Sequence, residues 1–451
     1  MLRDSSTAAV SKKISLAGDQ EKTGLGNYFI ANYPPFSFWT PQCVEAVHAV
    51  LSRSPQHASP LGLYVHIPFC RKRCKFCYFR VYTDKNARDI EEYLQRVLVE
   101  VSIYSSQAAI RDRSLDFVYF GGGTPSYLSA RQLRDFLGAL KRFMPWEQVK
   151  EVTFECEPGT LQRQKLEVLR ELGITRLSLG VENFNDTILE ENGRAHRSAE
   201  IFRAYQWIQE LAFPQVNIDL IAGMVGETWE NWRECIRQTI ALNPDSVTIY
   251  QMELPYNTEY AKTVRNGESL PLPLADWPTK RAWVDYAFDQ LIAAGYEVSS
   301  GYTLVRDKKR VQFHYRDALW HGADLLGTGV ASFGHIQGVH VQNFTEWDTY
   351  LQPLREGRLP LYRAYVCAPL ELCLREFILQ LKTGRVEFGY FLDKYGERLN
   401  LRFGEELHWL SEQGFAQFDD KQLVLTRAGL LQVDRLLPIF FLPQHRTHRY
   451  V

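Results

Sequence analysis

The chain lacks most of the features that mark a membrane-bound, secreted or nucleic-acid-binding protein. Its formal net charge is −1 and no long run of one charge sign occurs, which argues against a surface dedicated to a polyanion. No apolar stretch reaches membrane-spanning length, and the most apolar late stretch, residues 436–442, contains Pro438. The polar start of the chain has no apolar signal-peptide core. We therefore expect a cytoplasmic protein with no membrane span and no nucleic-acid partner.

Cysteine is also scarce, but it is concentrated. Eight cysteines in 451 residues are too few for a disulfide scaffold, which fits a reducing compartment. Three of them, Cys70, Cys74 and Cys77, form a C-x3-C-x2-C turn directly after a run typical of a buried strand. No second cysteine pair follows at zinc-ribbon spacing. Three thiolates on one turn can hold three corners of a cubic iron–sulfur cluster and leave the fourth iron open to a small molecule.

Two other interpretations of this turn are weaker. His66, four residues before Cys70, is a possible fourth ligand, but a strand histidine is more often a hydrogen-bonded core residue. Three structural thiols among several basic residues would be a reactive liability without a metal. The spacing therefore favours a [4Fe-4S] cluster held by the three cysteines.

From about residue 62 to about residue 300, short apolar runs alternate with amphipathic stretches. This alternation is typical of strand–helix units around a parallel sheet, either a barrel or a doubly wound sheet. The sequence predicts an α/β fold with six strands, at residues 63–68, 115–120, 151–156, 176–180, 216–222 and 246–252. Chemistry in such folds gathers outside the carboxyl ends of the strands.

Residues that could bind a ligand or take part in catalysis lie at the carboxyl ends of the expected strands. A Gly-Gly-Gly-Thr-Pro turn follows the second expected strand, and its bare backbone can approach a ligand closely, although such turns are often only tight connections. Glu155, Glu182, Arg194 and Asp219 lie at or near the same edge. Three acids and one guanidinium suit a cationic, zwitterionic ligand that carries a ribose, whereas each charge alone would more simply be solvated. A later glycine-rich stretch, residues 327–334, lacks dinucleotide-loop spacing.

The motifs together resemble the radical S-adenosylmethionine (SAM) enzymes, specifically the branch of the oxygen-independent coproporphyrinogen III oxidases. The resemblance covers residue 27 to the C-terminus and rests on the cysteine turn, on residues 121–125, 178–184 and 193–196, and on residues 219–223. It implies a partial (β/α)6 TIM-like barrel with a small C-terminal winged-helix-like module. The expected divisions are a disordered N-terminus at 1–26, an N-terminal extension at 27–60, the barrel at 61–300, a connecting, substrate-covering segment at 301–369 and the C-terminal domain at 370–451.

The resemblance also implies cofactors, partners and site residues. The cluster's open iron would bind SAM, whose cleavage gives a 5′-deoxyadenosyl radical. An electron donor such as flavodoxin or ferredoxin, a small-molecule substrate such as a tetrapyrrole or a conjugated natural product, and a monomeric protein are expected. A second SAM beside the first would bring in two further residues, Glu253 and Phe333. The remaining expected SAM-contacting residues are Tyr64, Phe76, Gly122, Gly123, Thr124, Glu155, Glu182, Arg194 and Asp219.

Two departures from the oxidase pattern bear on the reaction. Phe79 stands where the oxidases carry a further cysteine, and Glu182 stands where the branch has glutamine. The first change resembles the branch's haem chaperones and its radical methyltransferases and cyclopropanases, and the second adds negative charge near the sulfonium, which favours one or two cationic SAM molecules. The preferred hypothesis is one-carbon transfer from a second SAM to an unsaturated carbon, with Glu182 among the catalytic residues. The N-terminal extension resembles that of the oxidases, which favours oxidative decarboxylation of coproporphyrinogen III. A haem chaperone is the third hypothesis.

Overall fold

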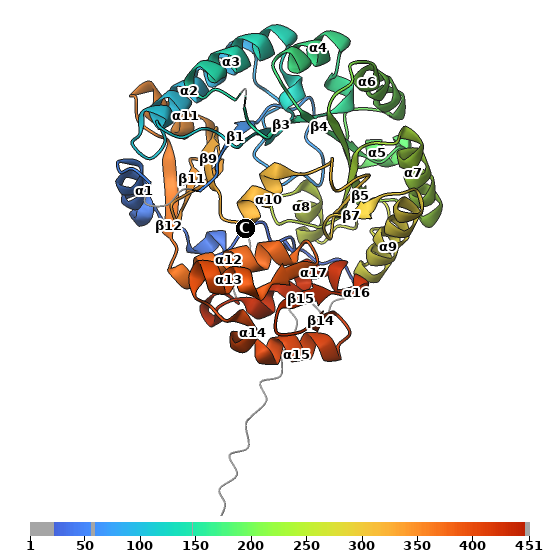
Figure 1. Ribbon diagram of the computed structural model, residues 1–451. Helices are drawn as coiled ribbons and strands as arrows, with labels where there is room; N and C mark the ends of the chain where they lie inside the picture. Colours follow the sequence, from blue (N-terminus) through green and yellow to red (C-terminus); the bar gives the residue numbers. More distant parts are fainter. Residues whose placement is uncertain (1–21, 56–58, 147, 447–451) are drawn as a thin grey trace, which may run out of the picture.

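A curved sheet forms the barrel wall in the computed structural model, which describes residues 22–55, 59–146 and 148–446 (Figure 1). Among these residues the sheet has twelve strands in the order β12-β11-β10-β9-β1-β2-β3-β4-β5-β6-β8-β7. Strands β9 and β1 to β6 run parallel to one another, whereas the pairings of β7, β8 and β10 to β12 with their neighbours are antiparallel. The parallel strands therefore place their carboxyl ends along one rim.

All six predicted parallel strands are confirmed. They are β1 (Leu61–Ile67), β2 (Phe117–Gly122), β3 (Glu151–Cys156), β4 (Arg176–Glu182), β5 (Gln215–Ala222) and β6 (Ser246–Gln251). Their residues are buried almost throughout, as expected for strands covered on both faces.

Helices cover the outer face of these strands (Figure 1). The third helix shows why: Ser129 caps its start, and Leu133, Leu137 and Leu140 recur at helical spacing and are buried. The helices of the barrel are α1 (Val44–Leu51), α2 (Ala87–Ser106), α3 (Ala130–Phe143), α4 (Arg163–Glu171), α5 (Asp186–Glu191), α6 (Ser198–Glu210), α7 (Trp229–Leu242), α8 (Glu259–Arg265), α9 (Trp277–Ala293), α10 (His314–Trp320) and α11 (Trp347–Arg355).

Residues 301–369 extend the sheet, whereas the sequence indicated only a connecting segment. The added strands are β8 (Thr303–Val305), β9 (Asp324–Thr328), β10 (Phe333–Ile336), β11 (Val339–Asn343) and β12 (Leu361–Val366). Strand β8 pairs with β7 (Glu297–Val298), which forms one edge of the sheet. Strands of three to six residues give too short a pattern to recognise among loops. The glycine-rich stretch lies in the β9–β10 hairpin, where a Cβ on Gly327 would be 2.1 Å from the Phe333 carbonyl oxygen. Close approach of two strands therefore explains that glycine.

The C-terminal residues form a separate layer between the two edges of the curved sheet (Figure 1). A three-stranded antiparallel sheet, β13-β15-β14, includes the β14–β15 hairpin. The winged-helix-like assignment and the domain boundaries stay predictions. The elements are α12 (Pro369–Leu381), β13 (Arg385–Glu387), α13 (Phe388–Tyr395), α14 (Leu399–Arg402), α15 (Gly404–Glu412), β14 (Ala416–Phe418), β15 (Gln422–Leu425), α16 (Arg427–Leu430) and α17 (Val433–Leu436).

Residues 23–39, which we call the strap, bind across the barrel and the C-terminal layer. The Gly26 N–H donates to the Leu254 carbonyl at 3.0 Å, the Ile30 N–H donates to Asp434 at 2.9 Å, and Lys382 Nζ donates to the Ile30 carbonyl at 2.6 Å. Residues 1–21 of the expected disordered N-terminus lie outside the described residues, whereas residues 23–26 hydrogen-bond to the barrel. Within the described ranges, no helix is long and apolar enough to cross a membrane.

Candidate active site

The cysteine turn leaves β1 at the carboxyl rim and is fastened to the glycine loop after β2. The Gly123 N–H donates to the Ile67 carbonyl and the Thr124 N–H donates to the Phe69 carbonyl, both at 2.9 Å. A Cβ on Gly122 would lie 2.4 Å from the His66 ring, and one on Gly123 would lie 2.8 Å from the Ile67 carbonyl oxygen. The two glycines are therefore required by the close approach of the loop to the turn.

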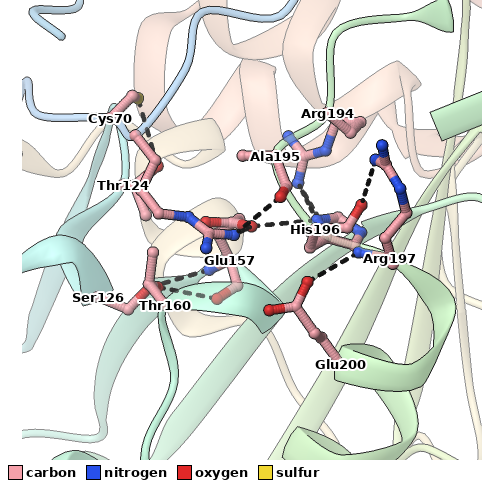
Figure 2. Close-up of polar contacts among 12 residues, drawn as sticks. Cys70, Thr124, Ser126, Glu157, Thr160, Arg194, Ala195, His196, Arg197 and Glu200 are labelled. Atoms are coloured by element: carbon pink, nitrogen blue, oxygen red, sulfur yellow. Dashed lines mark hydrogen bonds and ion pairs between the residues drawn. The ribbon is translucent and has the colours of Figure 1, made fainter. Parts of the chain in front are cut away.

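Cys70, Cys74 and Cys77 all lie on this turn with free thiols. Cys70 Sγ is 3.3 Å from Thr124 Oγ1, and Arg194 Nη1 is 3.4 Å from Cys74 Sγ (the first contact is drawn in Figure 2). Burial raises the pKa of the Cys70 thiol to about 11 and that of the Cys77 thiol to about 12. Iron binding would have to displace these protons, and the charge of Arg194 acts against burial by lowering the pKa of the Cys70 thiol.

His66 is fully engaged elsewhere. Its Nδ1 lies 3.2 Å from the Tyr64 hydroxyl and its Nε2 lies 3.2 Å from the Arg80 carbonyl oxygen. Burial lowers the pKa of His66 to about 4. The ring is thus a neutral, hydrogen-bonded core group. This agrees with the interpretation of His66 as a core histidine and not as a fourth cluster ligand.

Arg194 connects the cysteine turn to the acids of the rim. Its Nη2 donates to the Gly180 carbonyl at 2.7 Å, and its Nη1 lies 3.7 Å from Glu182 Oε1. Its Nε is buried and has no hydrogen-bond partner among the described residues. A buried donor without a partner is costly, so this atom is left able to donate to an acceptor group of a ligand.

Glu155, Glu182 and Asp219 surround the same space. Burial is the largest cause of the raised pKa of each, and the carboxyls also repel one another. The pKa values of Glu155 and Glu182 rise to about 7. Glu182 adopts a left-handed backbone (φ 64°) at a β-bulge between β4 and β5. Three carboxyl groups around one guanidinium leave room for positive charge, which a sulfonium and an ammonium would supply.

The acids are held in different ways. Glu155 accepts from the Tyr119 hydroxyl at 2.7 Å and from the Gly122 N–H at 3.2 Å. Asp219 accepts from the Ser178 hydroxyl at 2.7 Å and from the side-chain amide of Asn217 at 2.9 Å. Two rim acids are therefore fixed by neutral donors, which orient them without cancelling their charge.

Glu157 is a residue whose role the sequence analysis missed. Burial acts to raise its pKa, but a hydrogen bond from His196, the charge of Arg194 and a hydrogen bond from Arg71 lower it to about 2. Its carboxylate lies 2.9 Å from Arg71 and 3.3 Å from His196 Nδ1, below Arg194 in the cluster of Figure 2. An ionised carboxylate here helps to hold Arg194. The pattern Glu155-Cys156-Glu157 at the end of β3 could have indicated Glu157 as a second acid near the site.

Three predicted contacts are less central. Phe76 packs against the apolar side chains of Ile188 and Met224. Glu253 Oε2 accepts the Tyr28 N–H of the strap at 3.0 Å, and Phe333 packs on Phe36 with ring centroids 4.4 Å apart. The residues expected at a second SAM therefore both touch the strap.

Two partly exposed tyrosines interact electrostatically with the rim acids. Tyr78 and Tyr250 are 43% and 42% exposed, yet burial raises the pKa of both hydroxyls, and both hydroxyls sense the Glu155 carboxylate. Accessible surface combined with a buried environment is expected for side chains that face an interior space. Tyr64 stacks on Tyr119 with centroids 5.9 Å apart. The hollows lined by residues such as Leu401 and His408 instead lie on the C-terminal layer.

The site fits a cubic cluster better than a single metal ion. Within the residues that the structure describes, no three His, Cys, Asp or Glu side chains converge to bind one ion. A cubic cluster takes one thiolate per iron, so its three ligands stand apart. The three thiols on one turn, the unpartnered Arg194 Nε and the acids beside it match a cluster that carries a zwitterionic, cationic ligand.

Comparison with known proteins agrees with this geometry. The Radical SAM superfamily model matches residues 64–239. The heme chaperone HemW of Bacillus subtilis is 27% identical over 373 residues, covering 82% of this chain and 96% of the relative. The oxygen-independent coproporphyrinogen III oxidase of Pseudomonas aeruginosa is 27% identical over 429 residues, covering 90% of this chain and 91% of the relative.

A solved structure shows the same fold. Coproporphyrinogen III oxidase (HemN) from Escherichia coli matches with a TM-score of 0.80 and 24% sequence identity, covering 91% of this chain and 96% of that chain. The TIM-like α/β barrel, the family model and the two kinds of relative lead to one assignment. The chain therefore has a Radical SAM region within the HemN fold and resembles the HemN/HemW type of radical SAM enzymes, whose cofactors are a [4Fe-4S] cluster and S-adenosylmethionine.

Proposed function

We propose that Cys70, Cys74 and Cys77 hold the cluster and that the rim residues hold SAM beside it. The proposal is supported by the position of Arg194, which touches Cys74 and still has a buried, unpartnered Nε. In this assignment the Arg194 guanidinium binds the methionyl carboxylate of SAM. The remaining SAM-binding residues would be Tyr64, Phe76, Gly122, Gly123, Thr124, Glu155, Glu182 and Asp219.

When bound, the cluster supplies the electron that cleaves SAM to methionine and a 5′-deoxyadenosyl radical. The protein's own part is to hold the reactants. The carboxylates of Glu155 and Asp219, fixed by neutral donors, would accept from the ammonium or from the ribose hydroxyls. Glu182 would add negative charge near the sulfonium. The strap and the C-terminal layer would keep water out of the interior.

For the reaction itself, the comparisons favour oxidative decarboxylation or haem handling over one-carbon transfer, because the curated relatives carry those names. We propose oxidative decarboxylation of a tetrapyrrole such as coproporphyrinogen III. The observation that carries this choice is the strap, part of the N-terminal extension that resembles that of the oxidases, which is hydrogen-bonded to Glu253 after β6 and to Asp434 on α17. The oxidase alignment covers 90% of this chain, compared with 82% for the chaperone alignment.

The test is product analysis with anaerobically reconstituted, dithionite-reduced protein, SAM and coproporphyrinogen III. We expect 5′-deoxyadenosine, carbon dioxide and a decarboxylated tetrapyrrole detected by mass spectrometry, without S-adenosylhomocysteine. The matched control is Cys74→Ala protein treated in the same way. Stoichiometric haem binding with no SAM cleavage would refute the proposal and support a chaperone.

One-carbon transfer is the second candidate, because two residues favour it. Phe79 provides no thiol after Cys77, and Glu182 places a third carboxyl group beside Glu155 and Asp219, a charge that could balance two cationic SAM molecules. Glu253 and Phe333 would then approach the second SAM. Formation of S-adenosylhomocysteine together with 5′-deoxyadenosine, and transfer of isotope from methyl-labelled SAM to the substrate, would select this candidate over the decarboxylase.

A further inference from the structure

A buried arginine lies at the amino end of the parallel strands, away from the rim. Arg176 begins β4 and is 2% exposed. Its Nη1 donates to the Ser246 hydroxyl at 3.4 Å, and its guanidinium carbon lies 4.4 Å from the centroid of the Phe313 ring. Its Nε is buried without a hydrogen-bond partner, and Arg176 belongs to none of the ion pairs of the described residues. A buried cation without a carboxylate beside it is costly, so Arg176 requires compensation from further away.

Side chains of β4, β5 and β6 form a polar column between Arg176 and the rim. Ser178 on β4 lies opposite Asn217 on β5, and Asn217 lies opposite Ser246 on β6. Asp219 is the next residue of β5 on the same face, because side chains alternate along a strand. Ser178, Asn217 and Ser246 are at most 7% exposed. The column therefore joins a buried cation to one of the rim acids inside the barrel.

Every hydrogen bond along this column points from the cation to the carboxylate. Ser246 Oγ accepts from Arg176 and donates to Asn217 Oδ1 at 2.8 Å. Asn217 Nδ2 donates to Asp219 Oδ1 at 2.9 Å. It also donates to Ser178 Oγ at 3.0 Å, and this hydroxyl donates to Asp219 Oδ2 at 2.7 Å. A guanidinium can only donate and a carboxylate can only accept, so the two ends fix the orientation of the groups between them. Bonds aligned in this way strengthen one another.

Arg176 also acts on the charge of Asp219. Burial raises the pKa of Asp219, and the hydrogen bond from Ser178 and then the charge of Arg176 lower it. Burial is also the main cause of the raised pKa of Glu155 and Glu182, and the Asp219 charge adds to it. The cation at the far end of the column therefore favours the charged form of Asp219 among three competing acids.

We propose that Arg176 is a positioning residue for Asp219 and that it acts through Ser246 and Asn217 to keep this carboxylate charged and oriented toward SAM. The inference rests on the proposed function, in which Asp219 binds SAM. Arg176 contacts neither SAM nor the cluster in this assignment, so its contribution to SAM binding depends on Asp219. An arginine that only stabilises the barrel contributes equally with or without that carboxylate.

The test is a double-mutant cycle on SAM affinity. It is measured by equilibrium dialysis of radiolabelled SAM against anaerobically reconstituted protein whose cluster is left unreduced, so that SAM is not consumed. We expect Asp219→Asn to weaken SAM binding by about 10- to 100-fold. Arg176→Met should weaken it by about 3- to 10-fold in protein with Asp219 and by less than about 2-fold in the Asp219→Asn background.

Two further variants show whether the effect belongs to this column. Arg176→Lys keeps a donating cation and should recover most of the affinity lost in Arg176→Met protein. Arg316→Met is the matched control, because Arg316 lies 5.9 Å from the same Phe313 ring but donates to Ser299 at 3.0 Å, outside the column. It should leave SAM affinity unchanged in both backgrounds.

Two results would overturn the assignment. One is an equal loss of SAM affinity on Arg176→Met in both backgrounds, and the other is no loss in either. If Arg176→Met protein fails to assemble the cluster, seen as lost absorbance, Ser246→Ala breaks the same column at a neutral side chain. It should weaken SAM binding only in protein that has Asp219, and an equal effect in both backgrounds, or none, would again overturn the assignment.

The two proposals fail separately. The absence of 5′-deoxyadenosine from reduced wild-type reactions would refute the proposed radical function and leave the binding cycle intact. Unchanged SAM affinity in Asp219→Asn protein would remove Asp219 from the proposed SAM site and overturn the role of Arg176 with it. Weakened binding in Asp219→Asn protein, combined with an additive effect of Arg176→Met, would refute only the role of Arg176.

Discussion

Glu100 and the rim acids Glu155 and Glu182 have similarly raised pKa values, but their hydrogen-bond partners differ. Burial raises the pKa of Glu100, on α2, to about 7, as it does for Glu155 and Glu182 at the rim. Glu100, however, accepts from the Tyr350 hydroxyl and from Asn343 Nδ2, both at 2.6 Å, and from the Gly329 N–H at 2.9 Å. Glu182 has Arg194 at 3.7 Å.

The comparison teaches that a raised pKa alone does not identify an active site. Glu100 is a structural group, because its three donors tie α2 to the β9–β10 loop, to β11 and to α11, and complete its hydrogen bonding. The rim acids lie beside an unpartnered guanidinium nitrogen and three thiols, so their hydrogen-bonding capacity is open to a ligand. Substitutions at the rim should therefore change chemistry, and substitutions at Glu100 should change stability.

The largest effect is expected at the cluster. Cys74→Ala should abolish both the visible absorbance of the reconstituted cluster and the formation of 5′-deoxyadenosine, because a cubic cluster cannot be held by two of the three thiolates. Cys367→Ala, at a buried cysteine after β12, is the matched control and should retain both signals. Full SAM cleavage by Cys74→Ala protein would show that this turn is not the cluster site.

The next effect is expected at the guanidinium. Arg194→Met should slow SAM cleavage by about 100- to 1,000-fold, since it leaves buried acids unpaired and removes the donor for the ligand's carboxylate. Cluster absorbance and SAM cleavage are measured on the same samples. Arg197→Met, three residues away and partly exposed, is the control. An unchanged rate in Arg194→Met protein would remove Arg194 from the site.

The sequence predicted the residues at the carboxyl rim of the sheet. It did not predict the strap or strands β9 to β12. The six parallel strands have long apolar runs, and the chemistry-bearing residues follow them, so the cysteine turn, the glycine loop, Glu155, Glu182 and Asp219 could be placed at one edge in advance. Arg194 lies beyond α5 and was found through the motif at residues 193–196. These predictions depend on local patterns that are long enough to read.

The strap and strands β9 to β12 depend on long-range contacts instead. Ile30 and Asp434 are 404 residues apart in sequence, and nothing local in either residue indicates their hydrogen bond. Glu253 could be recognised as a polar residue after β6, but its pairing with the Tyr28 N–H required the folded chain. The link between Glu157, His196 and Arg194 was hidden for the same reason.

At the structural group, Glu100→Gln should lower the free energy of unfolding by about 1–3 kcal/mol, measured by urea denaturation of the iron-free protein. All three partners of Glu100 donate hydrogen bonds, so an amide, which has one acceptor oxygen, leaves a buried donor unpaired. The rate of SAM cleavage per assembled cluster should not change. Slower SAM cleavage at full cluster content would contradict the structural role.

The smallest effect is expected from Glu182→Gln, and it depends on pH. The folded protein raises the pKa of Glu182 from 4.5 to about 7, so the folded state binds this proton more tightly than the unfolded state does. Wild-type stability should therefore fall as pH rises from 4.5 to 7, by roughly 1–3 kcal/mol from this group. The iron-free Gln variant lacks this loss, so its advantage in the free energy of unfolding should grow across that interval. Glu190→Gln, on an exposed surface, should show no such trend, and parallel pH profiles of wild type and Glu182→Gln would mean that Glu182 does not carry the excess charge of the rim.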